Sequence, residues 1–191
     1  MANLKKKLLV IGGTGFIGFN LLKKAKKLGF SLTSISLKKP EKKKYLTGVK
    51  YLKLDISKKK ELKKIKNNFD YIVNAGGYGG LDNNFKNLKG IYSAQYTGVK
   101  NLASFFLNKN IRKFVQIGSS LEYASSSGIN SENVKIKNPI TIYGRAKLYS
   151  TNYLKFLYKI YDFPVVILRL YQVYGPIQKR NRIIPYIINS I

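Results

Sequence analysis

Short apolar segments alternate with amphipathic segments along the whole chain. Apolar and alternating runs, which are typical of strands, cover residues 8–12, 31–37, 49–56, 70–77, 113–120 and 163–170. Between them, apolar residues recur at helical spacing and predict helices over residues 16–29, 58–69, 85–107 and 140–161. A small, polar run over residues 125–133 predicts a loop.

This alternation predicts the fold class. A repeated strand–helix–strand order favours an α/β fold, in which helices cover both faces of a parallel sheet through right-handed crossovers. We therefore expect a doubly wound parallel sheet, and for its strand order we expect 3-2-1-4-5-6, the order of the Rossmann type among such sheets.

The composition removes several kinds of chemistry. The 191 residues include no Cys and no His, so disulfides, thiolate nucleophiles, His general bases and the usual zinc sites are excluded. A Ser-His-Asp hydrolase is excluded for the same reason, and we expect no metal site. The hydrophobic fraction of 45% is ordinary for a folded globular domain.

The net charge of +28 at pH 7 has two interpretations. It would attract a polyanion such as nucleic acid or an anionic membrane. However, only five of the 36 basic residues are Arg, which reads bases and binds phosphates in a bidentate manner, and the Lys residues are spread along the chain. We therefore expect a solvated lysine surface without specific nucleic-acid binding, and a polyanion-binding protein is the less favoured alternative.

The first apolar region does not fit a membrane segment. Residues 8–22 lack charge for only 15 residues, fewer than the roughly 18–20 of a membrane helix, and glycines interrupt them. No other segment is longer or more apolar. We therefore expect a cytoplasmic protein with no membrane span.

The motif GGTGFIG, residues 12–18, lies between the first predicted strand and the first predicted helix. Gly12 would allow a tight turn, Gly15 a close approach of the backbone to a ligand, and Gly18 close packing of the helix on the strand. The helix N-terminus would offer free N–H groups and a partial positive charge to an anion. This context predicts a site for the pyrophosphate of a dinucleotide.

The end of the second predicted strand bears on the kind of dinucleotide. The fold usually places an acid here, which binds the 2′-hydroxyl of the adenosine ribose. This chain has Ser36, Lys38 and Lys39 instead, and a hydroxyl with two cations suits a 2′-phosphate. The cofactor is therefore predicted to be NADP(H) or NAD(H), with NADP(H) favoured. The alternative is that both lysines simply belong to the charged surface.

Tyr143 and Lys147 form the candidate catalytic pair. Residues four apart lie on the same face of a helix, and a Lys ammonium beside a phenol favours the phenolate. Such a Tyr can pass a proton to or from a sugar hydroxyl while hydride moves to or from a nicotinamide. The alternative is an ordinary packed aromatic residue, because Tyr and Lys are both abundant in this chain.

Five segments in this order resemble the extended short-chain dehydrogenases/reductases, the NAD-dependent epimerase/dehydratase group. They are GGTGFIG (12–18), NAGG (74–77), GSSLEY (118–123), Pro139 with YGRAK (143–147), and LRLYQVYGPIQ (168–178). Asp55 and Ile56, after the third predicted strand, resemble the family's adenine-contacting Asp and its neighbour. The resemblance runs almost from end to end, and several ordered motifs are more specific than any one of them.

The resemblance implies roles for individual residues. Tyr143 would be the general acid/base, and Lys147 would lower its pKa and bind the nicotinamide ribose. Ser120 would hold the substrate hydroxyl or carbonyl, with Ser119 as the second choice. The cofactor-binding residues that the resemblance and the spacing imply are Gly12, Thr14, Gly15, Phe16, Ile17, Gly18, Ser36, Lys38, Asp55, Ile56, Ala75, Gly76, Tyr143, Lys147, Tyr171 and Val173.

Several positions depart from the family pattern. Gln95 and Gln172 stand where the family often has Asn, and Ala124 replaces a Gly. Dehydratases of the family carry an acidic pair or Thr-x-Glu after the fifth strand, whereas this chain offers only Glu122. We interpret Glu122 as a solvated carboxylate near the loop, although Ser120 and Glu122 could imitate the dehydratase arrangement.

The implied function is that of an NAD(P)-dependent oxidoreductase acting on a nucleotide-activated sugar. Keto-sugar reduction or epimerisation by hydride transfer at sugar carbon 4 is favoured over dehydration. The resemblance also implies a homodimer through the helices that the family counts as its fourth and fifth. Family members are usually much longer, and their C-terminal part binds the substrate nucleotide. We therefore expect a dinucleotide-binding domain over residues 1–175 and the beginning of a substrate-binding region over residues 176–191. The alternative function is a non-catalytic NAD(P)-binding module.

Overall fold

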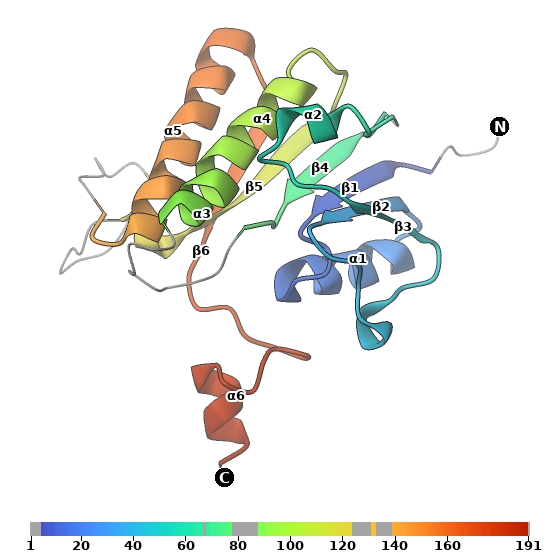
Figure 1. Ribbon diagram of the computed structural model, residues 1–191, viewed down its shortest axis with the longest axis vertical. Helices are drawn as coiled ribbons and strands as arrows, with labels where there is room; N and C mark the ends of the chain where they lie inside the picture. The colour runs from blue at the N-terminus through green and yellow to red at the C-terminus, as the bar shows by residue number, and fades with distance from the viewer. Residues whose placement is uncertain (1–4, 67, 78–87, 124–130, 133–138, 191) are drawn as a thin grey trace.

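The computed structural model describes residues 5–66, 68–77, 88–123, 131–132 and 139–190. Its centre is one sheet of parallel strands in the order β3-β2-β1-β4-β5-β6, which confirms the predicted topology (Figure 1). The strands are β1 (Lys7–Ile11), β2 (Ser31–Ser36), β3 (Val49–Lys53), β4 (Tyr71–Asn74), β5 (Lys113–Ser119) and β6 (Val165–Leu170).

Helices connect the strands. The α-helices are α1 (Phe16–Lys27), α2 (Lys59–Leu62), α3 (Leu88–Tyr92), α4 (Gly98–Phe106), α5 (Ile142–Tyr161) and α6 (Ile183–Ile188). A π-helical segment, η3 (Ser93–Thr97), joins α3 to α4. Two 3₁₀ turns, η1 (Lys42–Lys44) and η4 (Ser120–Glu122), follow β2 and β5.

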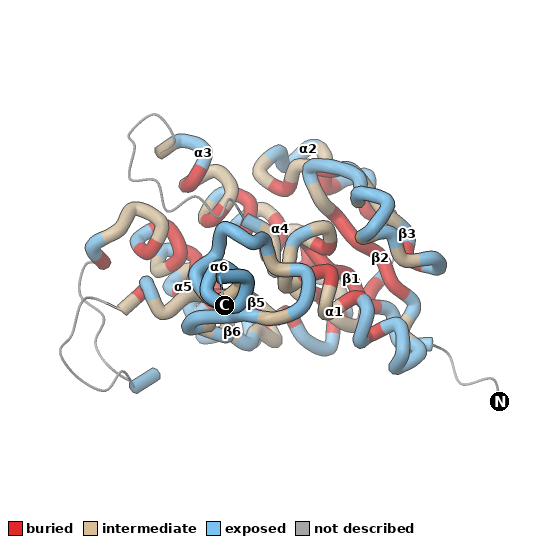
Figure 2. The backbone as a smooth tube through the Cα atoms, turned by 90° about the horizontal axis from the view of Figure 1, so that it is seen from below, coloured by how far each residue is buried: buried red, intermediate tan, exposed pale blue. Residues whose placement is uncertain are grey.

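The two faces of the sheet carry separate apolar clusters. On one face, Leu9 of β1 belongs to the larger cluster, together with Leu102 of α4 and Leu154 of α5. On the other face, Leu8 of β1 packs with Leu22 of α1. Since neighbouring residues of a strand point to opposite faces, β1 is buried on both sides, as its unbroken apolar run predicts. Figure 2 shows buried residues along β1 and β2 at the centre of the molecule.

The predicted helix over residues 58–69 is wrong in its length. The structure has only the single turn α2, although Leu62, Ile65 and Phe69 are buried as the spacing suggests. Lys pairs four residues apart, such as Lys59 with Lys63, repel each other on one face of a helix and oppose its extension. The apolar residues reach the core through turns instead.

The predicted long helix over residues 85–107 is present from Leu88 onward as α3, η3 and α4 in succession. The residues before Leu88 that belong to this prediction, and most of the predicted loop over residues 125–133, lie outside the described residues. Along the rest of the chain that is described, no helix is both long and apolar enough to cross a bilayer.

The chain after β6 runs away from the sheet. It ends in α6, which lies apart from the other helices (Figure 1) and has no buried residue (Figure 2). Ile183, Tyr186, Ile187 and Ile188 of this helix are largely exposed. The sheet and helices α1 to α5 therefore hold the core, and the carboxyl ends of the strands form the edge where a site is expected.

Candidate active site

The glycine motif forms the turn between β1 and α1. Gly12 has a φ of +78°, and a Cβ at this position would lie 2.7 Å from the Ala75 carbonyl oxygen of the chain leaving β4. A Cβ at Gly18 would collide with the Gly12 carbonyl oxygen. The turn is closed by a 2.9 Å hydrogen bond from the Gly15 amide to the Gly12 carbonyl. Gly12 and Gly18 therefore require glycine for the tight turn and the close packing that the motif predicts, whereas the ligand approach at Gly15 stays a prediction.

The beginning of α1 presents main-chain amides. Gly15 is its N-cap and provides no side-chain acceptor, and the first turn, which contains Phe16, Ile17 and Gly18, carries no acid. The positive end of the helix dipole is therefore not neutralised from within the helix. An anionic group, such as the pyrophosphate of a dinucleotide, fits this arrangement.

The end of β4 lies beside this turn. Asn74 is paired with Ile11 of β1, and the Ala75 amide donates a 3.0 Å hydrogen bond to the Ile11 carbonyl. Asn74 is buried, and its Oδ1 accepts a 3.1 Å hydrogen bond from the Gly76 amide. Gly12, Ala75 and Gly76 are thus brought together where the strand order reverses, which is the usual ligand position in such sheets.

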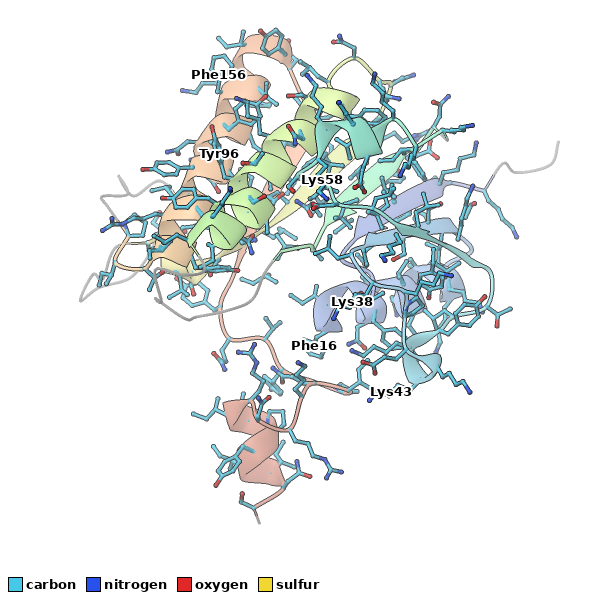
Figure 3. All side chains as sticks on the ribbon, in the orientation of Figure 1. Phe16, Lys38, Lys43, Lys58, Tyr96 and Phe156 are labelled. Atoms are coloured by element: carbon cyan, nitrogen blue, oxygen red, sulfur yellow. The ribbon has the colours of Figure 1, made fainter. Side chains whose placement is uncertain are left out.

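The end of β2 lies on the other side of the glycine turn. Ser36 Oγ accepts a 3.4 Å hydrogen bond from the Thr14 amide. Lys38 and Lys39 are exposed (Lys38 is labelled in Figure 3). Lys44 of η1 donates from Nζ to the Thr14 carbonyl at 3.4 Å. The sequence did not single out Lys44, because nothing in the run of three lysines distinguishes it.

Asp55 and Ile56 follow β3 at the same edge of the sheet. Asp55 Oδ1 accepts hydrogen bonds from the Ser57 amide at 2.9 Å and the Ser57 hydroxyl at 2.7 Å. Ile56 is buried, and its side chain lies against Gly98 at the start of α4. Asp55 is half-buried at the strand end where the family resemblance expects an adenine contact.

Tyr143 and Lys147 lie one turn apart at the beginning of α5. The helix begins after Thr141, whose Oγ1 accepts a 3.0 Å hydrogen bond from the Gly144 amide. Lys147 Nζ lies 5.7 Å from the centroid of the Tyr143 ring and donates a 2.7 Å hydrogen bond to the Ile117 carbonyl of β5. Lys147 is 3% exposed, so its ammonium is held inside the protein.

Burial changes the ionisation of both side chains. It lowers the pKa of Lys147 from 10.5 to about 8, and the negative charge of Glu122 opposes this change. It raises the pKa of Tyr143, and Glu122 adds to the rise, so the lowering by Lys147 that the resemblance implies is not found in the protein alone. Tyr143 is therefore a neutral phenol at neutral pH in the protein alone, as a proton donor must be. A positively charged nicotinamide nearby would favour the phenolate.

The two candidate serines lie where β5 ends. Ser119 is the last residue of β5, and its Oγ accepts a 3.2 Å hydrogen bond from the Leu121 amide. Ser120 is the first residue of η4, and both serines are half-buried. A Cβ at Gly144 would collide with the Leu121 carbonyl oxygen, so Gly144 allows α5 to lie directly against η4. This close packing brings the serine segment next to the start of α5.

The interpretation of Glu122 as a solvated carboxylate is wrong. Its side chain is fully buried and forms a 3.0 Å ion pair with Arg169 of β6. A buried carboxylate is tolerated when hydrogen bonds and an opposite charge compensate its lost hydration. Ser119 and Glu122 also form a capping box. In it, the Glu122 side chain accepts a hydrogen bond from the Ser119 amide, and the Ser119 side chain accepts one from a main-chain amide of the turn. The Ser-x-x-Glu spacing is the sequence signal that could have predicted the capping box.

The remaining sequence-predicted positions are dispersed. Gln95 is buried in η3, and its carbonyl accepts a hydrogen bond from Ser150 of α5. Tyr171, Gln172 and Val173 are exposed in the chain that leaves β6. Ala124 lies outside the described residues. Within the described part of the chain, no group of three or more acidic side chains is placed to hold a metal ion.

Comparison with known proteins identifies the family. The family model for the NAD dependent epimerase/dehydratase family matches residues 8–191. A dTDP-D-glucose 4,6-dehydratase from Dictyostelium discoideum is 28% identical over 97% of this chain and 48% of its own length. An ADP-L-glycero-D-manno-heptose-6-epimerase from Brachyspira hyodysenteriae is 30% identical over 88% of this chain and 55% of its own length. The chain thus spans about half the length of these relatives.

Solved structures share the fold. A UDP-glucuronic acid 4-epimerase from Bacillus cereus, in complex with NAD, superposes with a TM-score of 0.83 at 23% identity, over 96% of this chain and 62% of the other. The epimerase Mth375 from Methanothermobacter thermautotrophicus gives a TM-score of 0.86 at 24% identity, over 97% and 58% of the two chains. Taken with the glycine turn and the Tyr143–Lys147 pair, the family match shows that this chain belongs to the NAD-dependent epimerase/dehydratase family.

Proposed function

We propose that the protein is an NAD(P)-dependent oxidoreductase acting on a nucleotide-activated sugar, by keto-sugar reduction or epimerisation with hydride transfer at sugar carbon 4. The observation that carries the proposal is the buried Lys147 ammonium, 5.7 Å from the Tyr143 ring. Both side chains lie at the sheet edge that also carries the glycine turn. The family match and the NAD-bound structural relative support the same function.

The roles of the residues follow from their positions. When bound, the nicotinamide supplies the carbon that gives or takes the hydride. Tyr143 holds the proton that moves to or from the sugar oxygen, and Lys147, held by the Ile117 carbonyl, stabilises its phenolate when that forms. Ser120, or Ser119, would orient the same sugar oxygen.

The proposal includes the domain boundaries expected from the sequence. Residues 1–175 would form the dinucleotide-binding domain, and residues 176–191 would begin the substrate-binding region.

Glu122 supports reduction or epimerisation over dehydration. A dehydratase needs an acid that can give a proton to the leaving hydroxyl and a base that takes one from carbon. The Glu122 carboxylate is instead fully buried and already accepts hydrogen bonds from Thr151 Oγ1 at 2.7 Å and Arg169 Nε at 3.0 Å. The carboxylate is thus buried and already hydrogen-bonded within the protein, which does not suit a proton-transferring acid or base.

Three side chains support a preference for NADP(H). Ser36 contacts the glycine turn, Lys38 follows the same strand, and Lys44 reaches the Thr14 carbonyl. This hydroxyl and these cations suit a 2′-phosphate, which carries negative charge that an unmodified ribose lacks.

Cofactor binding tests this part of the proposal. NADPH fluorescence is expected to change on mixing, with a dissociation constant below that for NADH, and Lys44→Ala is expected to reduce the difference. Lys43→Ala is the matched control, because Lys43 is exposed and paired with Glu41. Binding of neither cofactor would contradict the proposed function, and equal affinity for both would contradict only the NADP(H) preference.

Replacement of Tyr143 tests the chemistry. With nucleotide keto-sugars as substrates, Tyr143→Phe is expected to lower turnover by roughly 10²–10⁴-fold while leaving the NADPH dissociation constant unchanged. Tyr149→Phe is the control, because Tyr149 is exposed on the same helix. A wild-type protein that binds the cofactor but turns over no sugar nucleotide would favour the non-catalytic module instead.

A further inference from the structure

We propose that Glu122 is a positioning residue of the candidate active site. Its buried carboxylate fixes the Ser119–Ser120 turn against α5 and β6 and provides the negative charge that balances the Lys147 ammonium. This inference rests on the proposed function, because the charge of Lys147 bears on catalysis only if Tyr143 exchanges protons there.

The contacts of Glu122 join β6 to β5 and α5, the two elements that carry Ser119 and the Tyr143–Lys147 pair. Glu122 Oε1 accepts a 2.9 Å hydrogen bond from the Ser119 amide at the end of β5. Glu122 Oε2 accepts from Thr151 of α5 at 2.7 Å and from Arg169 of β6 at 3.0 Å. Thr151 lies one helical turn after Lys147. The carboxylate therefore sets the position of the serine turn relative to the helix that carries Tyr143 and Lys147.

The surroundings hold the carboxylate in one place. The Arg169 side chain is 9% exposed and also donates from Nη1 to the Tyr123 hydroxyl at 3.1 Å. Its guanidinium lies 4.9 Å from the centroid of the Tyr123 ring. A Cβ at Gly118 would come within 2.5 Å of Glu122 Oε1, so the carboxylate lies directly against the backbone of β5. An acid packed in this way has little freedom to turn towards solvent or substrate.

Glu122 and Lys147 approach the same short stretch of β5 from different elements. Lys147 donates to the Ile117 carbonyl, whereas Glu122 accepts from the Ser119 amide two residues later. Burial lowers the pKa of Lys147 to about 8, and the charge of Glu122 acts against this lowering. Without that charge, a larger share of the molecules would carry a neutral Lys147 at neutral pH.

Other groups that face this pair come from three elements. Tyr143 lies on α5 itself, Arg169 on β6, and Tyr123 directly after η4. Arg169 is the one cation that directly contacts the Glu122 carboxylate among the described residues, so it balances part of the negative charge. That balance matters for Tyr143, because burial raises the pKa of its phenol and the negative charge of Glu122 adds to the rise. The negative charge of Glu122 thus favours an ammonium at Lys147, while the positive charge of Arg169 limits how strongly Glu122 disfavours a phenolate at Tyr143.

The test measures the ionisation of Lys147 in the full 191-residue chain without cofactor. Lysine side chains labelled with ¹³C and ¹⁵N are titrated by NMR, and the Lys147 signal is identified by its loss in Lys147→Arg. The wild-type midpoint is expected near pH 8. Glu122→Gln, which keeps the shape and removes the charge, is expected to move this midpoint down by roughly one pH unit. Glu122→Asp, which keeps the charge, is expected to leave the Lys147 midpoint close to the wild-type value.

Glu41→Gln serves as the control, because it removes a carboxylate whose side chain is 68% exposed. It is expected to leave the Lys147 midpoint unchanged. A folded Glu122→Gln variant with the wild-type midpoint would overturn the proposal. A purely structural role for Glu122 predicts that result, since Gln packs in the same volume.

A second measurement covers the case in which Glu122→Gln does not fold. The carboxyl carbons of the four Glu residues in the wild-type chain are observed by ¹³C NMR at pH 7. An ionised carboxylate at Glu122 supports the proposal, and a neutral carboxylic acid overturns it. Neither experiment needs a cofactor. Failure to bind NADH or NADPH would refute the proposed function, whereas an unmoved Lys147 midpoint would refute this inference alone.

Discussion

The buried ammonium of Lys147 links the chemistry of the site to the stability of the fold. In the folded protein its pKa is lowered from 10.5 to about 8, chiefly by burial. In the unfolded chain the side chain is solvated and keeps its ordinary pKa. Charged Lys147 therefore opposes folding below pH 8, and this opposition disappears above pH 10.5, where the side chain is neutral in both states.

This difference predicts a pH dependence. Between pH 8 and pH 10.5 the unfolded chain binds more protons at Lys147 than the folded protein, so the wild type is expected to gain stability relative to Lys147→Met. The gain over this window is expected to be roughly 1–3 kcal/mol. Urea unfolding at a series of pH values measures it, with Lys100→Met as the control at an exposed position. Parallel curves for wild type and Lys147→Met would contradict the prediction.

At the scale of elements, the periodicity predicted most of the architecture. The six strands followed from apolar runs alternating with helical spacing, because a parallel sheet covered on both faces needs both. Their order followed from the dinucleotide-binding glycine motif and the family resemblance, because the alternation alone fits more than one order. The predicted length of the helix over residues 58–69 was wrong. Hydrophobic spacing indicates which residues are buried, but it does not show that repulsion between Lys63 and neighbouring lysines opposes a longer helix.

The sequence also predicted most of the candidate site residues, but not the contacts that hold them. Spacing and resemblance pointed to Gly12, Tyr143 and Lys147, which the structure places at one edge of the sheet, and their roles stay predictions. Glu122 was misread because its partner Arg169 is 47 residues away in the chain. Lys44 was missed because its contact with Thr14 spans 30 residues and depends on how η1 folds back. Contacts between distant segments leave no local pattern.

Two glycines in helical segments predict opposite effects of the same substitution. Gly144→Ala is expected to destabilise the protein by roughly 1–3 kcal/mol, because the new Cβ collides with the Leu121 carbonyl oxygen and pushes α5 away from η4. Gly90→Ala on α3 is expected to stabilise it by roughly 0.4–1 kcal/mol, because nothing lies within 4 Å of the new Cβ. Thermal or urea unfolding of both variants measures the difference. Equal effects would show that α5 does not depend on this close approach.

At the scale of the whole molecule, the outer side of α5 offers a surface for a second copy. Tyr149, Phe156 and Ile160 recur along the helix and are 49%, 50% and 61% exposed. Tyr92 and Tyr96 of the preceding helical segments lie beside Tyr149 and extend the same aromatic surface. Phe156 projects from the outer side of α5 (Figure 3). An apolar surface of this kind is typical of an interface between protein chains.

We therefore propose the homodimer that the family resemblance implies. Sedimentation equilibrium is expected to show a dimer that strengthens with salt, because the net charge of +28 makes the copies repel each other until it is screened. Phe156→Glu with Ile160→Glu is expected to give a monomer that keeps its affinity for NADPH. Ile183→Glu on α6 is the matched control, since Ile183 is 62% exposed outside this surface. A wild type that is monomeric at every concentration and salt level would contradict the dimer.

The ion pair of Glu122 belongs to a wider feature of the carboxylates. Only eight residues are acidic, and several bind main-chain amides: Asp70 accepts from Lys7 N at 2.7 Å, Asp55 from Ser57 N at 2.9 Å, and Glu61 from Asp55 N at 2.8 Å. Exposed lysines, by contrast, are interchangeable with other polar residues. Sequence change in this protein is therefore expected to be tolerated unequally: many exposed lysines can be exchanged with little effect, whereas replacement of Asp55, Glu61 or Asp70 by an apolar residue would leave a main-chain amide without its acceptor.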